Sequence, residues 1–317
     1  MALLIGTDEA GYGPNLGPLV ISATAWQVPD ELGDADLFEL LRSVVARDSK
    51  DGRIAIADSK ILYKPGGGLA ALERGVLASL GAGGHVARSW RDLWQVLCPT
   101  ANSHLDSVPW YAGYDEQLPI DEEAQEISLL ASRLGTTLAD AGVHLQCVRA
   151  VAVFPSRFNR LLDRHTSKGS ALSNETLQLV RDVMDCCPAS QVLVRCDKHG
   201  GRNRYGPLLQ TQFPEHLVEI RREGRGESIY RWGPASRRIE IRFVAKCESF
   251  LPTALASMVA KYLRELAMRA FNAFWHDRVT DLRPTAGYPV DAKRFRQEIR
   301  QMQTDLGIED RILWRNK

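Results

Sequence analysis

A short apolar strand that ends in two adjacent acidic residues is the most constraining feature of the sequence. Residues 3–8 read LLIGTD, and Glu9 follows Asp8 directly. Such a run is typical of a strand inside a sheet, where neighbouring carboxylates lose hydration and repel each other. A Gly/Pro-rich turn (EAGYGPNLGP) then leads to a second apolar run at 19–26. We therefore expect a sheet whose first strand carries two charges at its tip.

Further strands and helices alternate loosely along the chain. Extended runs occur at 147–153, 191–197 and 239–246, and helical patterns occur at about 68–80, 120–140, 172–187 and 253–275. The 317 residues, 44% of them hydrophobic, are enough for a large core. This alternation predicts an α/β or α+β sheet domain.

Two other strand ends also carry a carboxylate. Asp197 ends the run VLVRCD, and Glu248 follows the run IRFVAKC. Strand ends can converge on one edge of a sheet, and a cluster of hard oxygen ligands suits Mg²⁺ or Mn²⁺. Two such ions can activate water and stabilise the leaving oxygen in phosphodiester cleavage. Each carboxylate alone has another interpretation, as a cap, the start of a glycine-rich loop or an ion-pair partner, and only convergence in space decides.

Cysteine spacing and hydropathy restrict the other classes. The six cysteines show no CxxC pair, which argues against a zinc site and for reduced thiols. The first residues lack the pattern of a signal peptide, and no stretch approaches the roughly 18 apolar residues of a membrane span. We expect a cytoplasmic protein without membrane contact.

The formal net charge of +1 is a cancellation between two segments. Residues 101–145 hold eight acidic residues and one basic residue, and residues 195–246 hold twelve basic and six acidic residues. A solvated face is the simplest interpretation of either segment, and a nucleic-acid contact is the alternative for the basic one.

Five short motifs occur in an order that resembles a known family. They are GTDEAGYGP at 6–14 with GPLV at 17–20, DSK with Leu62 at 58–62, VLV leading to Asp197, KCES with ASMVAK at 246–261, and GYP at 287–289. This set is similar to the type 2 ribonucleases H, ribonucleases HII and HIII. The matched regions cover about two thirds of the chain.

The resemblance implies a ribonuclease H-like fold, with a mixed five-stranded sheet flanked by helices. It also implies metal-dependent endonucleolytic cleavage of RNA in RNA/DNA hybrids that leaves 5′-phosphate and 3′-hydroxyl ends. Carried over by position, the metal ligands and catalytic residues would be Asp8, Glu9, Asp197 and Glu248, with two Mg²⁺ or Mn²⁺ ions. The substrate-binding residues would be Gly11, Tyr12 and Gly13 at the ribose 2′-hydroxyl, Ser59 and Lys60 near phosphate, and Tyr288 stacked on a sugar.

The chain also departs from the family. Tyr12 stands where the HII branch has Arg, Glu248 resembles the HIII branch, and the third motif reads CDKHGG. Two stretches are longer than usual, an acidic helical insertion at about 84–145 and an Arg-rich hairpin insertion at about 202–238. We expect a divergent member with one catalytic domain over 1–317, a helical tail at about 290–317, and a monomeric state.

The insertions suggest further roles. A hairpin is expected at 217–231, and the nucleic-acid backbone contacts proposed on and near the basic insertion are Arg202, Arg204, Arg221, Arg222 and Lys261. Tyr205, Tyr230 and Trp232 lie among the arginines, where aromatic rings can stack on bases. The tryptophans and tyrosines of the acidic insertion are expected to be packing residues, and His165 and His199 to be surface residues.

The sequence therefore predicts a divalent-metal-dependent endoribonuclease that cleaves RNA in RNA/DNA hybrids, with an RNA/DNA hybrid or another RNA-containing duplex as its partner. A catalytically weak or inactive nucleic-acid-binding protein that keeps the same groove is the alternative. An ATPase of the actin/hexokinase type is a third possibility, but it would need a second phosphate-binding glycine turn that the sequence does not show.

Overall fold

The computed structural model describes residues 1–33, 35–48, 51–165 and 167–316. The strands are β1 (Ala2–Ala10), β2 (Leu19–Val28), β3 (Val45–Ala46), β4 (Ile54–Ala55), β5 (His144–Val153), β6 (Gln191–Asp197), β7 (Glu219–Glu223), β8 (Glu227–Trp232) and β9 (Arg238–Val244). The α-helices are α1 (Leu37–Leu40), α2 (Ser59–Leu62), α3 (Ala70–Ala82), α4 (Trp90–Leu97), α5 (Asn102–Ser107), α6 (Ala124–Asp140), α7 (Pro155–Arg164), α8 (Lys168–Cys186), α9 (Gly206–Gln212), α10 (Leu251–His276), α11 (Pro289–Glu298), α12 (Arg300–Asp305) and α13 (Asp310–Leu313). Short 3₁₀ turns are η1 (Asp30–Leu32), η2 (Pro99–Ala101) and η3 (Cys247–Ser249).

The main sheet is mixed, in the order β5-β2-β1-β6-β9-β8-β7. β1 pairs antiparallel with β2 and parallel with β6, and β9 is parallel to β6. The hairpin β7–β8 then pairs antiparallel onto β9, so the sheet has seven strands rather than five. The predicted fold class, a mixed α/β sheet flanked by helices, is confirmed, and the extra strands arise because the hairpin joins the sheet edge.

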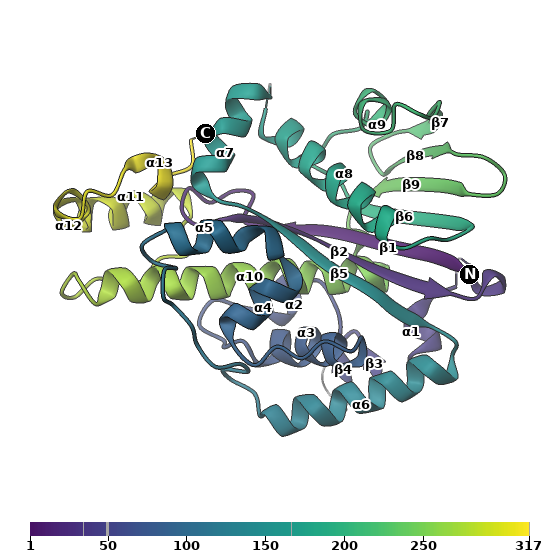
Figure 1. Ribbon diagram of the computed structural model, residues 1–317, viewed down its shortest axis with the longest axis horizontal. Helices are drawn as coiled ribbons and strands as arrows, with labels where there is room; N and C mark the ends of the chain where they lie inside the picture. The colour runs from purple at the N-terminus through teal and green to yellow at the C-terminus, as the bar shows by residue number, and fades with distance from the viewer. Residues whose placement is uncertain (34, 49–50, 166, 317) are drawn as a thin grey trace.

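Helices cover the two faces of the sheet (Figure 1). α10 lies on β1 and β2, with α3 and α6 stacked beyond it. α8 lies on the other face, against β2, β5 and β1. Alternation along β1 divides its side chains between the two cores, since Leu4 joins the α10 side and Leu3 and Ile5 join the α8 side.

A glycine in β1 lets α10 approach the sheet closely. A Cβ atom on Gly6 would lie 2.1 Å from the backbone nitrogen of Thr253 and 2.2 Å from the carbonyl carbon of Pro252. Pro252 is tolerated there because it occupies the first turn of α10, where its missing N–H is not needed. The first turn of α10 therefore lies directly against the strand that carries Asp8 and Glu9.

The two predicted insertion segments contain regular structure. The region at about 84–145 holds α4, α5 and α6, and its aromatic residues Trp90, Trp94, Trp110 and Tyr111 are buried. The region at about 202–238 holds α9 and the hairpin β7–β8, which confirms the expected hairpin. Residues 289–313 form three short helices, and residue 317 of the predicted tail lies outside the described residues. No helix among the described residues is long and apolar enough to cross a membrane.

Two predictions about side-chain exposure in and beside the basic insertion are wrong. Tyr205, Tyr230 and Trp232 are 0–1% exposed and pack in the α8-side core, so they are not free to stack on bases. Tyr205 lies flat on Phe243, with ring centroids 3.5 Å apart. His199 was expected at the surface but is 2% exposed. The strand parity of β8 turns its aromatic residues inward and its arginine outward.

Candidate active site

The four predicted carboxylates come from three elements at one end of the sheet. Asp8 and Glu9 lie near the end of β1, Asp197 is the last residue of β6, and Glu248 is in η3, just after β9. β1 and β6 are parallel neighbours, with Thr7 opposite Cys196, so their ends meet at the same edge. Asp8 is only 8% exposed. The fold thus places these side chains around one edge, as strand order dictates.

Burial disfavours the charged forms of all four groups, and repulsion between carboxylates adds to the effect at Asp8, Glu9 and Glu248. Burial is the largest cause and raises the pKa of Asp8 to about 7, and the charges of Asp197 and Glu248 add to the effect. Burial, followed by the charges of Asp8 and Asp197, raises the pKa of Glu9 to about 8. The pKa values of Asp197 and Glu248 are raised chiefly by burial as well. The site therefore concentrates more negative charge than its surroundings balance.

Lys60 interacts electrostatically with all four carboxylates. Burial alone would lower the Lys60 pKa, but Asp58, Asp8, Glu248 and Asp197 together raise it above its usual value. Asp58 caps α2 by accepting the Lys60 backbone N–H at 2.9 Å, which fixes the start of that turn. The exposed ammonium group of Lys60 is therefore stabilised by several carboxylates at this edge.

Ser257 of α10 links Asp8 to the DSK segment. Its hydroxyl is hydrogen-bonded to the Asp8 carboxyl, which lowers the Asp8 pKa against the effect of burial. The same oxygen lies 3.0 Å from the Ser59 hydroxyl and accepts the Ser59 backbone N–H at 3.3 Å. Ser59 is only 6% exposed, so this contact predicts support of Asp8 rather than direct contact with phosphate. Sequence reasoning missed Ser257, although it lies in the ASMVAK motif.

The four carboxylates are not arranged as a preformed metal-holding group. Among the described residues, no group of three or more His, Cys, Asp or Glu side chains is arranged so that it could hold a metal ion. Like charges repel, and Asp197 is held back by the backbone N–H of Lys246 at 3.1 Å. The ligand set has the right chemistry for a hard divalent cation, because every candidate donor is a carboxylate oxygen.

A cavity of about 570 Å³ adjoins the site, and both acidic and basic side chains line it. Its walls include Asp197 and Glu248 together with Lys60, Arg47 and Lys246. Arg47 packs over the Phe38 ring at 3.9 Å and donates to the Ser249 carbonyl at 3.2 Å. Sequence reasoning missed Arg47, which lies in no motif. Cations and carboxylates therefore line the same cavity.

The glycine-rich turn after β1 lies beside the predicted stacking residue. Gly11 has φ = +87°, a conformation that favours glycine. A Cβ atom on Gly13 would lie 3.9 Å from the Tyr288 ring, and Tyr288 is 58% exposed. Tyr12 extends toward the β6–α9 loop, since a Cβ atom on Gly200 would be 3.1 Å from its hydroxyl. Gly13 and Tyr288 thus share one accessible surface.

The residues predicted to contact the nucleic-acid backbone are dispersed over the structure. Several of them already pair with other side chains of the protein. Lys261 pairs with Glu265 at 2.5 Å, and Arg202 donates to the Ser170 hydroxyl at 2.8 Å. Arg204 is 86% exposed and lies 3.8 Å from Glu223. Arg221 and Arg222 are exposed on β7. None of these contacts is with the four carboxylates.

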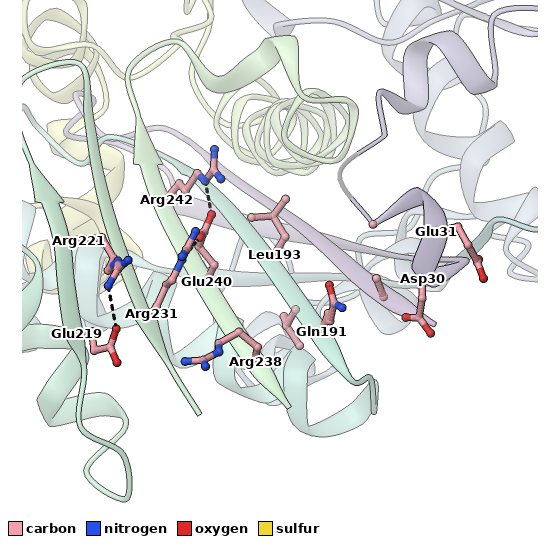
Figure 2. Close-up of a pocket in the computed structure, with 13 residues that line it drawn as sticks. Asp30, Glu31, Gln191, Leu193, Glu219, Arg221, Arg231, Arg238, Glu240 and Arg242 are labelled. Atoms are coloured by element: carbon pink, nitrogen blue, oxygen red, sulfur yellow. Dashed lines mark hydrogen bonds and ion pairs between the residues drawn. The ribbon is translucent and has the colours of Figure 1, made fainter. Parts of the chain in front are cut away.

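Figure 2 shows a pocket lined by arginines, on the part of the sheet where the hairpin β7–β8 pairs with β9. A cavity of about 710 Å³ lies over the first residues of β6 and β9, at the opposite end of these strands from Asp197. Arg231 and Arg242 both bind Glu240, and Arg221 binds Glu219. Acidic and basic side chains alternate here, so the basic segment is partly neutralised where it meets the sheet.

No family model matches the chain, and no curated protein matches it in sequence. Among solved structures, the ribonuclease H2 from Pyrococcus horikoshii OT3 is 16% identical, over 98% of this chain and 92% of that one, with a TM-score of 0.46. The RNase H3 of Aquifex aeolicus is 13% identical, over 98% and 70%, with a TM-score of 0.40. Bst-RNase HIII in complex with Mn²⁺ is 13% identical, over 99% and 66%, with a TM-score of 0.41. Values this low assign no family.

Proposed function

We propose that this chain is a divalent-metal-dependent endoribonuclease that cleaves RNA in RNA/DNA hybrids. The observation that supports this most is the electrostatic coupling of four partly or fully buried carboxylates at one sheet edge. A structural role does not explain Asp8 and Glu9 side by side, because burying adjacent carboxylates costs stability that a cation would return. The motifs around these residues resemble type 2 ribonucleases H, which gives the substrate class.

Each group then has a role. Asp8, Glu9, Asp197 and Glu248 would hold one or two Mg²⁺ or Mn²⁺ ions, which when bound would activate water and neutralise charge on the leaving oxygen. Ser257 orients the Asp8 carboxyl through its hydroxyl. The exposed Lys60 attracts the phosphate, and the 570 Å³ cavity with Arg47 and Lys246 receives the backbone next to it.

The glycine-rich turn supplies the preference for RNA. Gly11 and Gly13 allow the backbone to approach a ribose closely, and the 2′-hydroxyl is the group that distinguishes RNA from DNA. Tyr288 stacks on the neighbouring sugar from the surface it shares with Gly13. Tyr12, which points toward Gly200, leaves the turn without the guanidinium of the HII branch.

A binding protein without catalysis is the second candidate. It is favoured by one observation, the lack of an assembled metal-holding group among the described residues. In this case the carboxylates would be remnants, and the chain would bind hybrids with a strong salt dependence.

The test combines cleavage with metal binding. Wild-type protein, Asp8→Asn, Asp197→Asn and the exposed control Asp140→Asn are incubated with an end-labelled RNA/DNA hybrid and either Mg²⁺ or Mn²⁺. We expect wild type and Asp140→Asn to cleave the RNA strand, and both site variants to lose cleavage while remaining folded by circular dichroism. Calorimetric titration with Mn²⁺ should give heat with wild type and none with Asp8→Asn. Salt-sensitive binding without cleavage in either metal would favour the second candidate.

A further inference from the structure

The turn between β1 and β2 is held from its inner side by a buried arginine of α10. Arg264 donates to the Pro18 carbonyl at 2.6 Å and to the carbonyls of Leu16 at 3.3 Å and Ala286 at 2.9 Å. A Cβ atom on Gly11 would lie 2.8 Å from Arg264 Cδ. One guanidinium thus ties residues 16–18 to the segment before Tyr288.

A second segment, far away in sequence, holds the same turn. The backbone N–H of Arg315 donates to the Asn15 carbonyl at 2.8 Å, and the Asn15 side-chain amide donates to the Arg315 carbonyl at 3.0 Å. Leu16 and Trp314 form an antiparallel bridge. Residues 314–316 therefore lie along the turn as a short strand would.

α7 supports this segment from its other side. The Asn159 side-chain amide donates to the Trp314 carbonyl at 2.9 Å, and the Asn316 backbone N–H donates to Asn159 Oδ1 at 2.8 Å. The segment is thus fixed between the turn and α7, and a change in the segment would reach the turn directly.

Burying the Arg315 guanidinium costs folding stability. It is 0% exposed, donates to the Pro14 carbonyl, and lies 4.9 Å from the Phe158 ring centroid. Within the described part of the chain, Nε and Nη1 have no hydrogen-bond partner and the guanidinium has no ion-pair partner. Burial and the nearby Arg264 charge hold its pKa well below the usual range. A leucine or methionine would fill such a site at lower cost, so packing alone does not account for an arginine.

We propose that Arg315, with residues 314–316, is a positioning residue for the substrate-contacting turn. It fixes the backbone of Pro14 and Asn15, and this sets where Gly11 and Gly13 present their backbone to the ribose. The proposal rests on the proposed function for its substrate, but the support of the turn is a property of the chain alone. Pre-positioning such a turn lowers the cost of ordering it when the hybrid binds.

Hydrogen–deuterium exchange on the full chain tests the support directly. Arg315→Met keeps the bulk but removes the donors, Arg315→Lys keeps the charge without the planar fork, and Arg311→Met is the matched change on an exposed arginine of α13. We expect amides of residues 11–17 to exchange about tenfold faster in Arg315→Met, because the turn opens locally while β6 and α8 keep their protection. Arg315→Lys should lie between, and Arg311→Met should match wild type.

Binding and kinetics test the link to substrate. With a short fluorescein-labelled RNA/DNA hybrid, Arg315→Met should raise KM about tenfold and change kcat less than twofold, the pattern of lost binding rather than lost chemistry. Asn159→Ala, which frees the segment from α7 without opening the core, should show the same pattern more weakly.

Three results would overturn the inference. Unchanged exchange of residues 11–17 in Arg315→Met would show that the segment does not hold the turn. Faster exchange spread equally over β6 and α8 would show a global loss of stability instead. A kcat loss without a KM change would assign Arg315 to the chemistry and not to positioning. A wild type that neither binds nor cleaves the hybrid would refute the proposed function, whereas the exchange result would still decide whether the segment holds the turn.

Discussion

Replacing Gly6 by alanine should move α10 away from the strand that carries Asp8. The added Cβ atom would lie 2.1 Å from the Thr253 backbone nitrogen, and ordinary contact begins at 3.4 Å. The two elements must therefore separate by the difference, about 1.3 Å, because both neighbours are backbone atoms and no side chain can turn aside. Such overpacking costs about 1–3 kcal/mol.

The separation also breaks a specific contact. The Thr24 hydroxyl of β2 donates to the Pro252 carbonyl at 2.8 Å, and a shift of this size lengthens that bond beyond useful range. Losing it adds about 1 kcal/mol, so we expect Gly6→Ala to lower the free energy of unfolding by about 3 kcal/mol.

A second glycine gives the matched control with the opposite sign. Gly135 lies inside α6, and a Cβ atom there would meet nothing within 4 Å. Gly135→Ala should raise the free energy of unfolding by about 0.5–1 kcal/mol, because alanine loses less backbone entropy in a helix. Urea unfolding followed by circular dichroism measures both. A Gly6→Ala protein within about 1 kcal/mol of wild type would refute the close approach of α10 to β1.

Three further substitutions test other contacts. Glu73 is 0% exposed and accepts two backbone N–H groups at 2.6 and 2.8 Å, so Glu73→Gln should lower the free energy of unfolding by about 2 kcal/mol in urea titrations. Burial raises the Glu240 pKa, but its hydrogen bonds with Arg231 and Arg242 outweigh this and hold it below its usual 4.5. Its stabilisation is therefore present above pH 4.5 and lost as pH falls further, so the stability gap between wild type and Glu240→Gln should narrow below that pH in unfolding titrations. Ser257→Ala removes the hydroxyl bound to Asp8 and should weaken Mn²⁺ binding about tenfold by calorimetry, with no change expected for Asp140→Asn.

The sequence predicts the strands better than it predicts which side chains are exposed to solvent. β1, β2 and β6 lie where their apolar runs indicate, because the local order of apolar residues is enough to predict a buried strand. Tyr230 and Trp232 were misassigned because their arginine neighbours suggested a basic surface. Their even spacing along β8 already places them together on one face, opposite Arg231, so parity was the signal that could have corrected the prediction.

The buried arginines were beyond sequence reasoning for a different reason. Nothing local distinguishes Arg315 from the exposed Arg311, since the two differ only in what the rest of the chain places beside them. Arg315 is buried by contacts with Pro14 and Asn15, 300 residues away. Contacts of that sequence separation depend on the whole topology, and no window of sequence contains them.

Around Asp8, rigid elements fix the position of one candidate ligand, although the described carboxylates are not arranged as a metal-holding group. Hydroxyl groups of β2 hold α10 by its carbonyls, since Ser22 donates to Ala256 and Thr24 donates to Pro252. These contacts fix where Ser257 stands and, through it, where the Asp8 carboxyl points. Glu248 instead lies in the short turn η3 and is only half-buried, whereas Asp8 lies in a central strand and is 8% exposed. If cations bind here, Asp8 should keep its place and Glu248 should be the ligand that moves, because the cost of moving a residue follows the rigidity of the element that carries it.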